Sequence, residues 1–172
     1  MQWLNIYFEI LIDHFETHGL IIDKFIGDGV LGYTVLGEEG DPASLINQTT
    51  RSLLKFYDKV HSMTENMASY NLTKISIGIG AQFGEVVIGL VGSKSKRQYT
   101  IVGDPVNQAS RFEGLCRRFS TDFIVSEPIF DRLLNNETKE LFEVAEAVQI
   151  KGIDEPMNLY VRTVRDRIRS TG

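Results

Sequence analysis

Two short stretches of the sequence combine residue types that could handle a metal ion and a phosphate. The first is Lys24-Phe-Ile-Gly-Asp28-Gly, in which glycines flank an aspartate and a lysine lies four residues before it. Glycines on both sides allow a tight turn that exposes the carboxylate, and such a hard oxygen ligand suits Mg²⁺ together with substrate phosphates. Asp-Gly pairs also occur in turns for conformational reasons alone, so this segment by itself leaves both interpretations open.

The second stretch is Tyr99-Thr-Ile-Val-Gly-Asp-Pro-Val-Asn-Gln-Ala-Ser-Arg111. Its Asp104-Pro105 pair is typical of a helix start, with Asp104 as the predicted cap. Asn107 and Arg111 are four residues apart and therefore share one face of that helix. An amide, a fixed positive charge and a helix N-terminus together favour an anion, although a solvated polar face has the same pattern.

Composition excludes several other classes of protein. The 18 basic and 23 acidic residues give a net charge of −5, which argues against a nucleic-acid or membrane-surface binder. Cys116 is the single cysteine, so no intramolecular disulfide and no cysteine-based zinc site is expected. The sequence has no P-loop, no Gly-x-Ser-x-Gly, no His-Glu-x-x-His, no secretory signal and no apolar stretch that could span a bilayer. We expect a cytoplasmic protein without membrane contact.

The two stretches must be positioned by an alternation of helices and hairpins. Apolar periodicity predicts helices over residues 4–18, 42–70, 105–118 and 128–134. Hairpins are predicted for residues 20–36, around Asp28-Gly29, and for residues 74–91, where strand 74–81 pairs with strand 86–91. Further strands are predicted at 99–102, 123–125, 142–150 and 157–164. This order predicts an α+β fold, with helices packed on a mostly antiparallel sheet.

Taken together, the two stretches resemble the signature segments of class III nucleotidyl cyclases. The likeness extends from the helix over residues 4–15 to Ile150-Lys-Gly-Ile-Asp-Glu-Pro-Met-Asn-Leu-Tyr, and so covers nearly the whole sequence. It implies a cyclase catalytic domain over residues 1–165, followed by a basic tail, 166–172. The implied fold derives from a ferredoxin-like βαββαβ core, and its first strand is missing from this sequence.

The resemblance also implies roles for six residues. Asp28 matches one of two aspartates that hold a pair of Mg²⁺ or Mn²⁺ ions. Lys24 and Thr100 match the pair that reads the purine, and their types resemble those of bicarbonate-responsive adenylate cyclases. A lysine only donates hydrogen bonds and therefore suits the unprotonated N1 of adenine, whereas guanine carries a hydrogen there.

The other three residues match positions that contact the sugar and phosphates. Asn107 matches the residue that orients the ribose, Arg111 matches the one that stabilises charge on the transferring phosphate, and Lys151 resembles a lysine on the outgoing phosphates. The implied reaction converts ATP to 3′,5′-cyclic AMP and pyrophosphate by in-line attack of the 3′-hydroxyl on the α-phosphate. In this family the active sites lie at the interface of a head-to-tail dimer, so a homodimer or a complementing heterodimer is expected.

One departure from the family pattern affects the expected activity. The second metal-binding aspartate belongs to a motif of the type Asp-x-x-Gly-Phe-Thr, which does not occur in these 172 residues. We therefore expect little turnover from the 172-residue chain alone. The alternatives are a catalytically impaired regulatory or dimerisation module that complements an active partner, and a guanylate cyclase.

Overall fold

The computed structural model describes residues 2–68 and 76–163. The chain divides into two compact units. The first unit comprises Met1–Ser76 and Val87–Val102, and the second comprises Ile77–Val86 and Gly103–Gly172. The basic tail predicted at 166–172 lies outside the described residues.

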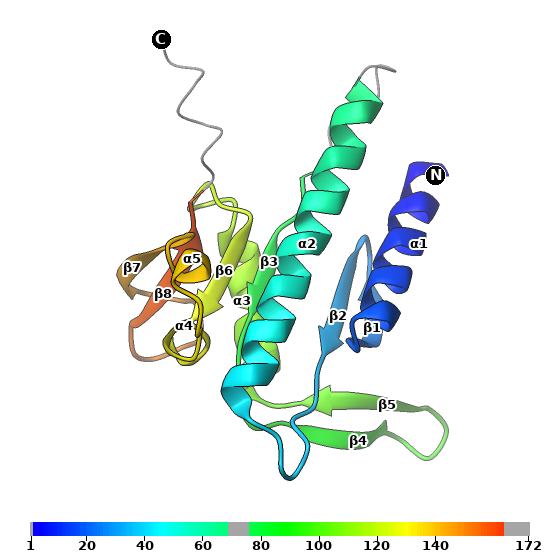
Figure 1. Ribbon diagram of the computed structural model, residues 1–172. Helices are drawn as coiled ribbons and strands as arrows, with labels where there is room; N and C mark the ends of the chain where they lie inside the picture. The colour runs from blue at the N-terminus through cyan, green and yellow to red at the C-terminus, as the bar shows by residue number, and fades with distance from the viewer. Residues whose placement is uncertain (1, 69–75, 164–172) are drawn as a thin grey trace. The chain divides into compact units, whose positions relative to one another are not determined.

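The first unit contains two long helices, a hairpin and a two-stranded ribbon (Figure 1). Its elements in chain order are α1 (Gln2–Thr17), β1 (Ile21–Ile26), β2 (Gly29–Tyr33), α2 (Pro42–Ala68), β4 (Val87–Gly92) and β5 (Arg97–Val102). Helix α2 begins where the sequence predicts. The carboxylate of Asp41 accepts a hydrogen bond from the backbone nitrogen of Ser44 at 2.9 Å, and Pro42 is the first helical residue.

Aromatic and aliphatic side chains hold α1 against α2. Leu11 on α1 is fully buried, and the rings of Tyr7 and Phe15 approach the ring of Phe56 on α2 with centroid distances of 6.3 and 6.1 Å. Val60, one turn further along α2, is 1% exposed. Burying side chains of this size contributes about 1.5–3 kcal/mol each relative to exposure, so this contact is a main source of stability in the first unit.

The hairpin of β1 and β2 confirms the predicted turn around Asp28. Ile26 pairs with Gly29, so Gly27 and Asp28 form a two-residue connection. Gly27 has a φ of 64°, and a glycine at the first of two turn positions is the pattern of a type II′ turn. Gly27 rather than Gly29 is therefore the glycine that this turn requires. Strand β2 ends at Tyr33, three residues before the predicted end.

The second predicted hairpin is wrong. Strand β4 pairs antiparallel with β5, from Val87 opposite Val102 to Gly92 opposite Arg97, and not with the strand that precedes it. Of the predicted strand 74–81, residues 74–75 lie outside the described residues, and the strand that is present, β3, comprises Ile79–Ala81. It pairs in parallel with β6, and both belong to the second unit. The loop at residues 93–96 closes the β4–β5 ribbon, because the backbone nitrogen of Ser93 donates to the carbonyl of Lys96 at 3.0 Å.

The second unit is built around one four-stranded sheet with the strand order β3-β6-β8-β7. Its elements are β3 (Ile79–Ala81), α3 (Asp104–Leu115), β6 (Phe123–Ser126), α4 (Glu127–Asp131), α5 (Asn136–Lys139), β7 (Phe142–Val148) and β8 (Met157–Arg162). The β3–β6 pair is parallel and the other two pairs are antiparallel, so the predicted α+β class is correct. The short helix α5 was not predicted from the sequence.

Helix α3 packs closely on β3 and β6. All four residues of β6 are buried, and Phe112 of α3 is fully buried beside them. Gly80 on β3 allows this approach, because a Cβ at that position would collide with the backbone of α3 at Ala109 and Glu113. The core continues through Cys116, Leu159 and Ile150, which lie in one cluster with Phe112. This packing fixes which face of α3 remains available for function.

Candidate functional site

The six predicted site residues divide equally between the two units. The first unit carries Lys24 and Asp28, on and just after β1, and Thr100 on β5. The second unit carries Asn107 and Arg111 on α3, and Lys151 in the connection between β7 and β8.

Strand β1 contains an irregularity next to the predicted purine-reading lysine. Ile22 pairs with Gly32 and Lys24 pairs with Leu31, so Asp23 is an extra residue without a partner on β2. Such a bulge changes the direction of the side chains around it and is often found beside active sites. In a regular strand Asp23 and Lys24 would point to opposite faces. Here the Lys24 ammonium lies 3.2 Å from the Asp23 carboxylate.

Asp23 joins the two residues predicted to read the base. Its Oδ2 accepts a hydrogen bond from the Thr100 hydroxyl at 2.8 Å, and its Oδ1 accepts one from the backbone nitrogen of Ile101 at 3.1 Å. The Asp23 side chain is 2% exposed, whereas that of Lys24 is 32% exposed. Lys24 and Thr100 are 76 positions apart in sequence, and one buried carboxylate contacts both. Sequence reasoning missed Asp23, because nothing in its spacing marks it as different from a turn or strand residue.

Asp28 is exposed at the tip of the β1–β2 hairpin. Its negative charge acts on Tyr7 of α1: burial and, secondarily, the Asp28 carboxylate raise the pKa of Tyr7 to about 12. An exposed carboxylate at a turn suits Mg²⁺, which takes one or two protein carboxylates and keeps its remaining positions for water and phosphates. Among the described residues, no group of three or more His, Cys, Asp and Glu side chains could hold a metal ion.

Helix α3 begins one residue earlier than predicted. Gly103 is the N-cap, in an extended conformation, and Asp104 is the first helical residue. The prediction that Asp104 caps this helix is therefore wrong; as an acidic residue in the first turn it still interacts favourably with the helix dipole. Asn107 is exposed, Arg111 is partly buried, and both leave the apolar side of α3 to Phe112.

The Arg111 guanidinium is held by the turn that carries Lys151. Its Nη1 donates to the carbonyl of Gly152 at 2.9 Å. The backbone nitrogen of Ile153 donates to the carbonyl of Ile150 at 3.0 Å, and Gly152 has a φ of 75°. A positive φ at the third residue defines a type II turn and favours glycine there. The second unit thus brings together Arg111 and the Lys151-Gly152 turn, with two cationic side chains on neighbouring segments.

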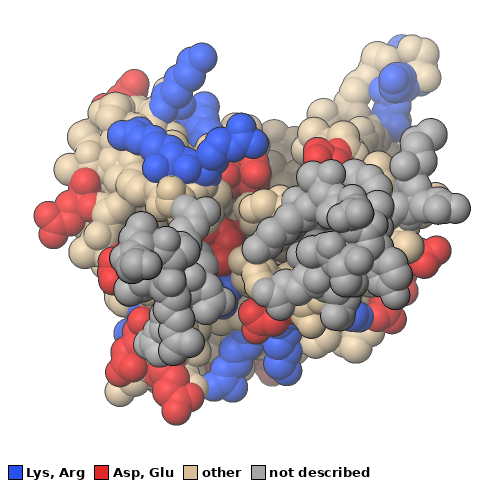
Figure 2. All heavy atoms as spheres, turned by 90° about the horizontal axis from the view of Figure 1, so that it is seen from above, with Lys and Arg blue, Asp and Glu red and all other residues tan. Residues whose placement is uncertain are grey.

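Charged side chains of both signs lie on the face drawn in Figure 2. The chain has a net charge of −5, and its predicted site residues include lysine, arginine and aspartate side chains. Binding of an anionic substrate therefore depends on local cations such as Lys24, Arg111 and Lys151, and not on a general positive field. None of the described helices combines the length and apolar character needed to cross a membrane.

Comparison with known proteins identifies the family. The family model for the adenylate and guanylate cyclase catalytic domain matches residues 24–163. An adenylate cyclase of Anabaena cylindrica is 32% identical over 164 residues, which cover 92% of this chain and 31% of that protein. The chain spans less than a third of the length of the curated relatives it matches.

Solved structures of cyclases have the same fold. The guanylyl cyclase Cya2 is 26% identical and superimposes with a TM-score of 0.72, covering 92% of this chain and 77% of its own. The adenylyl cyclase CyaB from P. aeruginosa is 21% identical and superimposes with a TM-score of 0.73. The match covers 94% of this chain and 80% of that chain. These structures share the fold, and the match of the family model over residues 24–163 shows that the chain belongs to the class III adenylate and guanylate cyclase catalytic domains.

Proposed function

We propose that this domain is an adenylate cyclase, which converts ATP to 3′,5′-cyclic AMP and pyrophosphate at the interface of a homodimer. The observation that carries the proposal is the Asp23 carboxylate in contact with both Lys24 and Thr100. This arrangement holds the cationic donor of Lys24 on β1 close to the hydroxyl of Thr100 on β5, within one unit. A purine has a ring nitrogen next to an exocyclic group, and two adjacent protein groups of this kind suit both positions.

The chemistry of Lys24 favours adenine over guanine. Its ammonium has three donors and no acceptor. The N1 atom of adenine accepts a hydrogen bond, whereas N1 of guanine carries a hydrogen and would face the ammonium as a second donor. The Lys24 side chain is 32% exposed, so it can reach a ligand while paired with Asp23. A base that leaves such a donor unpaired loses the hydrogen bond and incurs the cost of desolvating the ammonium.

Asp28 is the residue of this chain that would hold a divalent metal ion. Class III cyclases use divalent metals, and we propose two Mg²⁺ or Mn²⁺ ions per active site. When bound, such ions lower the pKa of the 3′-hydroxyl and stabilise charge on the phosphates. The exposed position of Asp28 at a hairpin tip fits this role, because it leaves the carboxylate oxygens accessible to an ion that also contacts substrate.

Arg111, Asn107 and Lys151 act on the sugar and phosphates in this proposal. The planar guanidinium of Arg111 can offer two parallel donors to a phosphate. Its bond to the Gly152 carbonyl restricts the guanidinium before substrate arrives, which reduces the entropic cost of positioning it. Asn107, one turn before Arg111 on the exposed side of α3, orients the ribose, and Lys151 contacts the outgoing phosphates.

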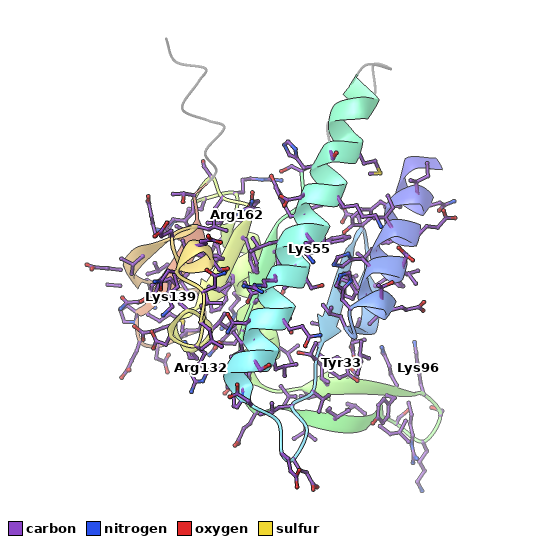
Figure 3. All side chains as sticks on the ribbon, in the orientation of Figure 1. Tyr33, Lys55, Lys96, Arg132, Lys139 and Arg162 are labelled. Carbon is purple, nitrogen blue, oxygen red and sulfur yellow. The ribbon has the colours of Figure 1, made fainter. Side chains whose placement is uncertain are left out.

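The β4–β5 ribbon supports association with a second cyclase domain. Val87, Leu90 and Tyr99 are 73%, 65% and 62% exposed, an unusual concentration of large apolar side chains on a short ribbon. Figure 3 shows Lys96 at the loop that ends this ribbon. We propose that the apolar ribbon is covered by a second copy of this domain.

We also propose that the domain works in the cytoplasm, which the single cysteine supports.

A regulatory cyclase-like module is the second candidate. Such a module would supply Asp28, or Asn107 and Arg111, to a partner domain that carries the other groups. The two candidates differ in whether a homodimer turns over ATP.

The test measures cyclic nucleotide release from ATP and from GTP with Mg²⁺ or Mn²⁺. The chain is compared alone and with the motif-bearing strand of a cyclase relative joined ahead of residue 1. Little product from the chain alone and cyclic AMP from the extended chain are expected. Cyclic GMP as the main product would assign a guanylate cyclase, and a folded, dimeric extended chain without any product would contradict the catalytic proposal.

A further inference from the structure

The bulge residue Asp23 controls where the Thr100 hydroxyl proton points. As the ion-pair partner of Lys24, the Asp23 carboxylate can only accept hydrogen bonds. Its Oδ2 lies 2.8 Å from the Thr100 hydroxyl, which must therefore act as the donor in this contact. The other acceptor within reach of the hydroxyl is the Ile101 carbonyl at 3.5 Å, a longer and weaker contact.

Three donors fix the position of this carboxylate. The Ile101 backbone nitrogen donates to Oδ1 at 3.1 Å, while Thr100 and Lys24 contact Oδ2 at 2.8 and 3.2 Å. With the Asp23 side chain 2% exposed, water cannot readily replace any of them. Hydrogen bonds to a charged acceptor are stronger than those between neutral groups, so the orientation of the hydroxyl is well determined.

A hydroxyl that already donates its proton in one hydrogen bond has only its lone pairs left for a further partner. A free threonine hydroxyl can donate or accept, and so discriminates poorly between an amino group and a carbonyl group. With its proton on Asp23, the Thr100 oxygen can only accept. The exocyclic 6-amino group of adenine is a donor and matches it, whereas the 6-carbonyl group of guanine is an acceptor and does not.

We propose that Asp23 is a specificity-determining positioning residue, which makes Thr100 an acceptor and thereby favours adenine nucleotides over guanine nucleotides. This inference rests on the proposed function as an adenylate cyclase. The bulge in β1 is the backbone feature that makes the arrangement possible, because it brings Asp23 and Lys24 close together although they are consecutive in the strand. Lys24 supplies the donor half of the pattern and Thr100 the acceptor half.

The test is a double-mutant cycle on base preference. Asp23→Asn, Thr100→Val and the double variant are made in the 172-residue chain, and the dissociation constants of ATP and GTP are measured by calorimetry. An asparagine can turn its amide donors toward Thr100, which frees the hydroxyl proton for a carbonyl group. The preference for ATP over GTP should fall roughly 3- to 10-fold in Asp23→Asn, the effect of one hydrogen bond. The same change should have no further effect once Thr100 is valine.

Asp13→Asn is the matched control, since Asp13 also pairs with a lysine of the first unit, Lys59 at 3.3 Å, but on an exposed surface. It should leave the preference unchanged. Thermal unfolding of each variant identifies any that fail to fold; Thr100→Ser, which keeps the hydroxyl, should keep the preference of the parent chain. Two outcomes overturn the role of Asp23 but leave the proposed function intact. One is an unchanged preference for ATP over GTP in folded Asp23→Asn, and the other is an equally large fall in that preference when Asp23→Asn is made in the Thr100→Val background. A parent chain that binds neither nucleotide contradicts the proposed function, and the inference falls with it.

Discussion

The guanidinium of Arg111 is hydrogen-bonded to the backbone carbonyl of Gly152, 2.9 Å away and 41 residues later in the sequence. Gly152 is the positive-φ residue of a tight turn, and a Cβ built on it would lie 2.9 Å from the Nη2 atom of Arg111. The conformation of this turn and the position of the arginine are therefore coupled. A glycine that looks like a simple turn residue also leaves the space that the guanidinium occupies.

Gly152→Ala tests this coupling. The new side chain would destabilise the turn by about 1–2 kcal/mol, because L-residues are strained at this φ. It would also displace Arg111, so kcat of a catalytically complete chain should fall roughly 10- to 100-fold, as expected when a charge-stabilising group is misplaced. Unfolding and steady-state kinetics measure the two effects.

Gly114→Ala is the control for that experiment. Gly114 lies in α3 as Arg111 does, and a Cβ there meets nothing within 4 Å. Alanine should raise stability by roughly 0.5–1 kcal/mol, since glycine is unfavourable inside a helix, and kcat should not change. Equal kinetics for Gly152→Ala and the parent chain would show that the turn does not position Arg111.

A buried hydroxyl predicts a stabilising substitution. Ser126 is fully buried at the N-cap of α4, and its Oγ has no hydrogen-bond partner within the described part of the chain. Pro128, the second residue of the helix, lacks the N–H that a capping serine commonly binds. Ser126→Ala should therefore raise the free energy of unfolding by about 1 kcal/mol, the cost of an unpaired buried hydroxyl.

Thr121→Val serves as the comparison for Ser126→Ala. The Thr121 hydroxyl donates to the carbonyl of Arg162 at 2.7 Å and is partly buried. Removing that bond should lower stability by about 1 kcal/mol. If Ser126→Ala and Thr121→Val destabilise equally in urea unfolding, the Ser126 hydroxyl has a stabilising contact and the prediction fails.

The sequence predicted the elements whose signals lie within a few residues. The capped start of α2 at Asp41-Pro42 and the turn at Gly27-Asp28 are both present, because each depends on local backbone preferences. The helix carrying Asn107 and Arg111 was also predicted, although it begins one residue earlier and ends three residues earlier than expected.

Contacts between distant segments could not be predicted in the same way. Strand β3 pairs with β6, with Ile79 opposite Phe123, and no local pattern distinguishes this parallel pair from a hairpin with the next strand. The bulge at Asp23 has the same origin, since a register shift depends on both strands and on Thr100 from a third. The likeness to cyclases supplied six site residues but not the buried carboxylate that contacts two of them.

His14 should make stability depend on pH. Its side chain is buried, and its Nε2 lies 2.9 Å from both the carbonyl and the hydroxyl of Ser52. Burial, followed by the charge of the stacked His18, lowers the pKa of His14. The unfolded chain, in which the imidazole titrates near its usual pKa of about 6.5, binds the proton more readily than the folded chain. The contribution of neutral His14 to stability is therefore fully present above a pH of about 6.5, and it is lost as the pH falls through the lowered pKa of the folded state.

His14→Gln removes this titration and should flatten the decline in the urea midpoint as the pH falls below about 6.5. Gly114→Ala, which changes no titratable group, should keep the slope of the parent chain. Identical slopes for the parent and His14→Gln would show that protonation of His14 is not linked to folding.

The last prediction tests whether each active site is shared between two chains. In the proposed homodimer, one chain supplies Asp28 and the other supplies Asn107 and Arg111. In a chain extended by the second aspartate, Asp28→Ala and Arg111→Ala should each be nearly inactive, since one loses a metal ligand and the other loses a charge that stabilises the transition state. Mixing the two variants forms heterodimers in which one site carries both defects and the other carries none, so cyclic AMP production should reappear.

Asn107→Ala mixed with Arg111→Ala provides the matched control, because both residues lie on α3 and belong to the same half of each site. Each site of that heterodimer keeps one defect, and the mixture should stay inactive. Subunit exchange is verified in both mixtures by energy transfer between labelled chains, so that an inactive mixture has a definite meaning. Restored activity in the first mixture alone supports a shared site. Activity in neither mixture, with exchange verified, contradicts the assignment of Asp28 and Arg111 to opposite chains.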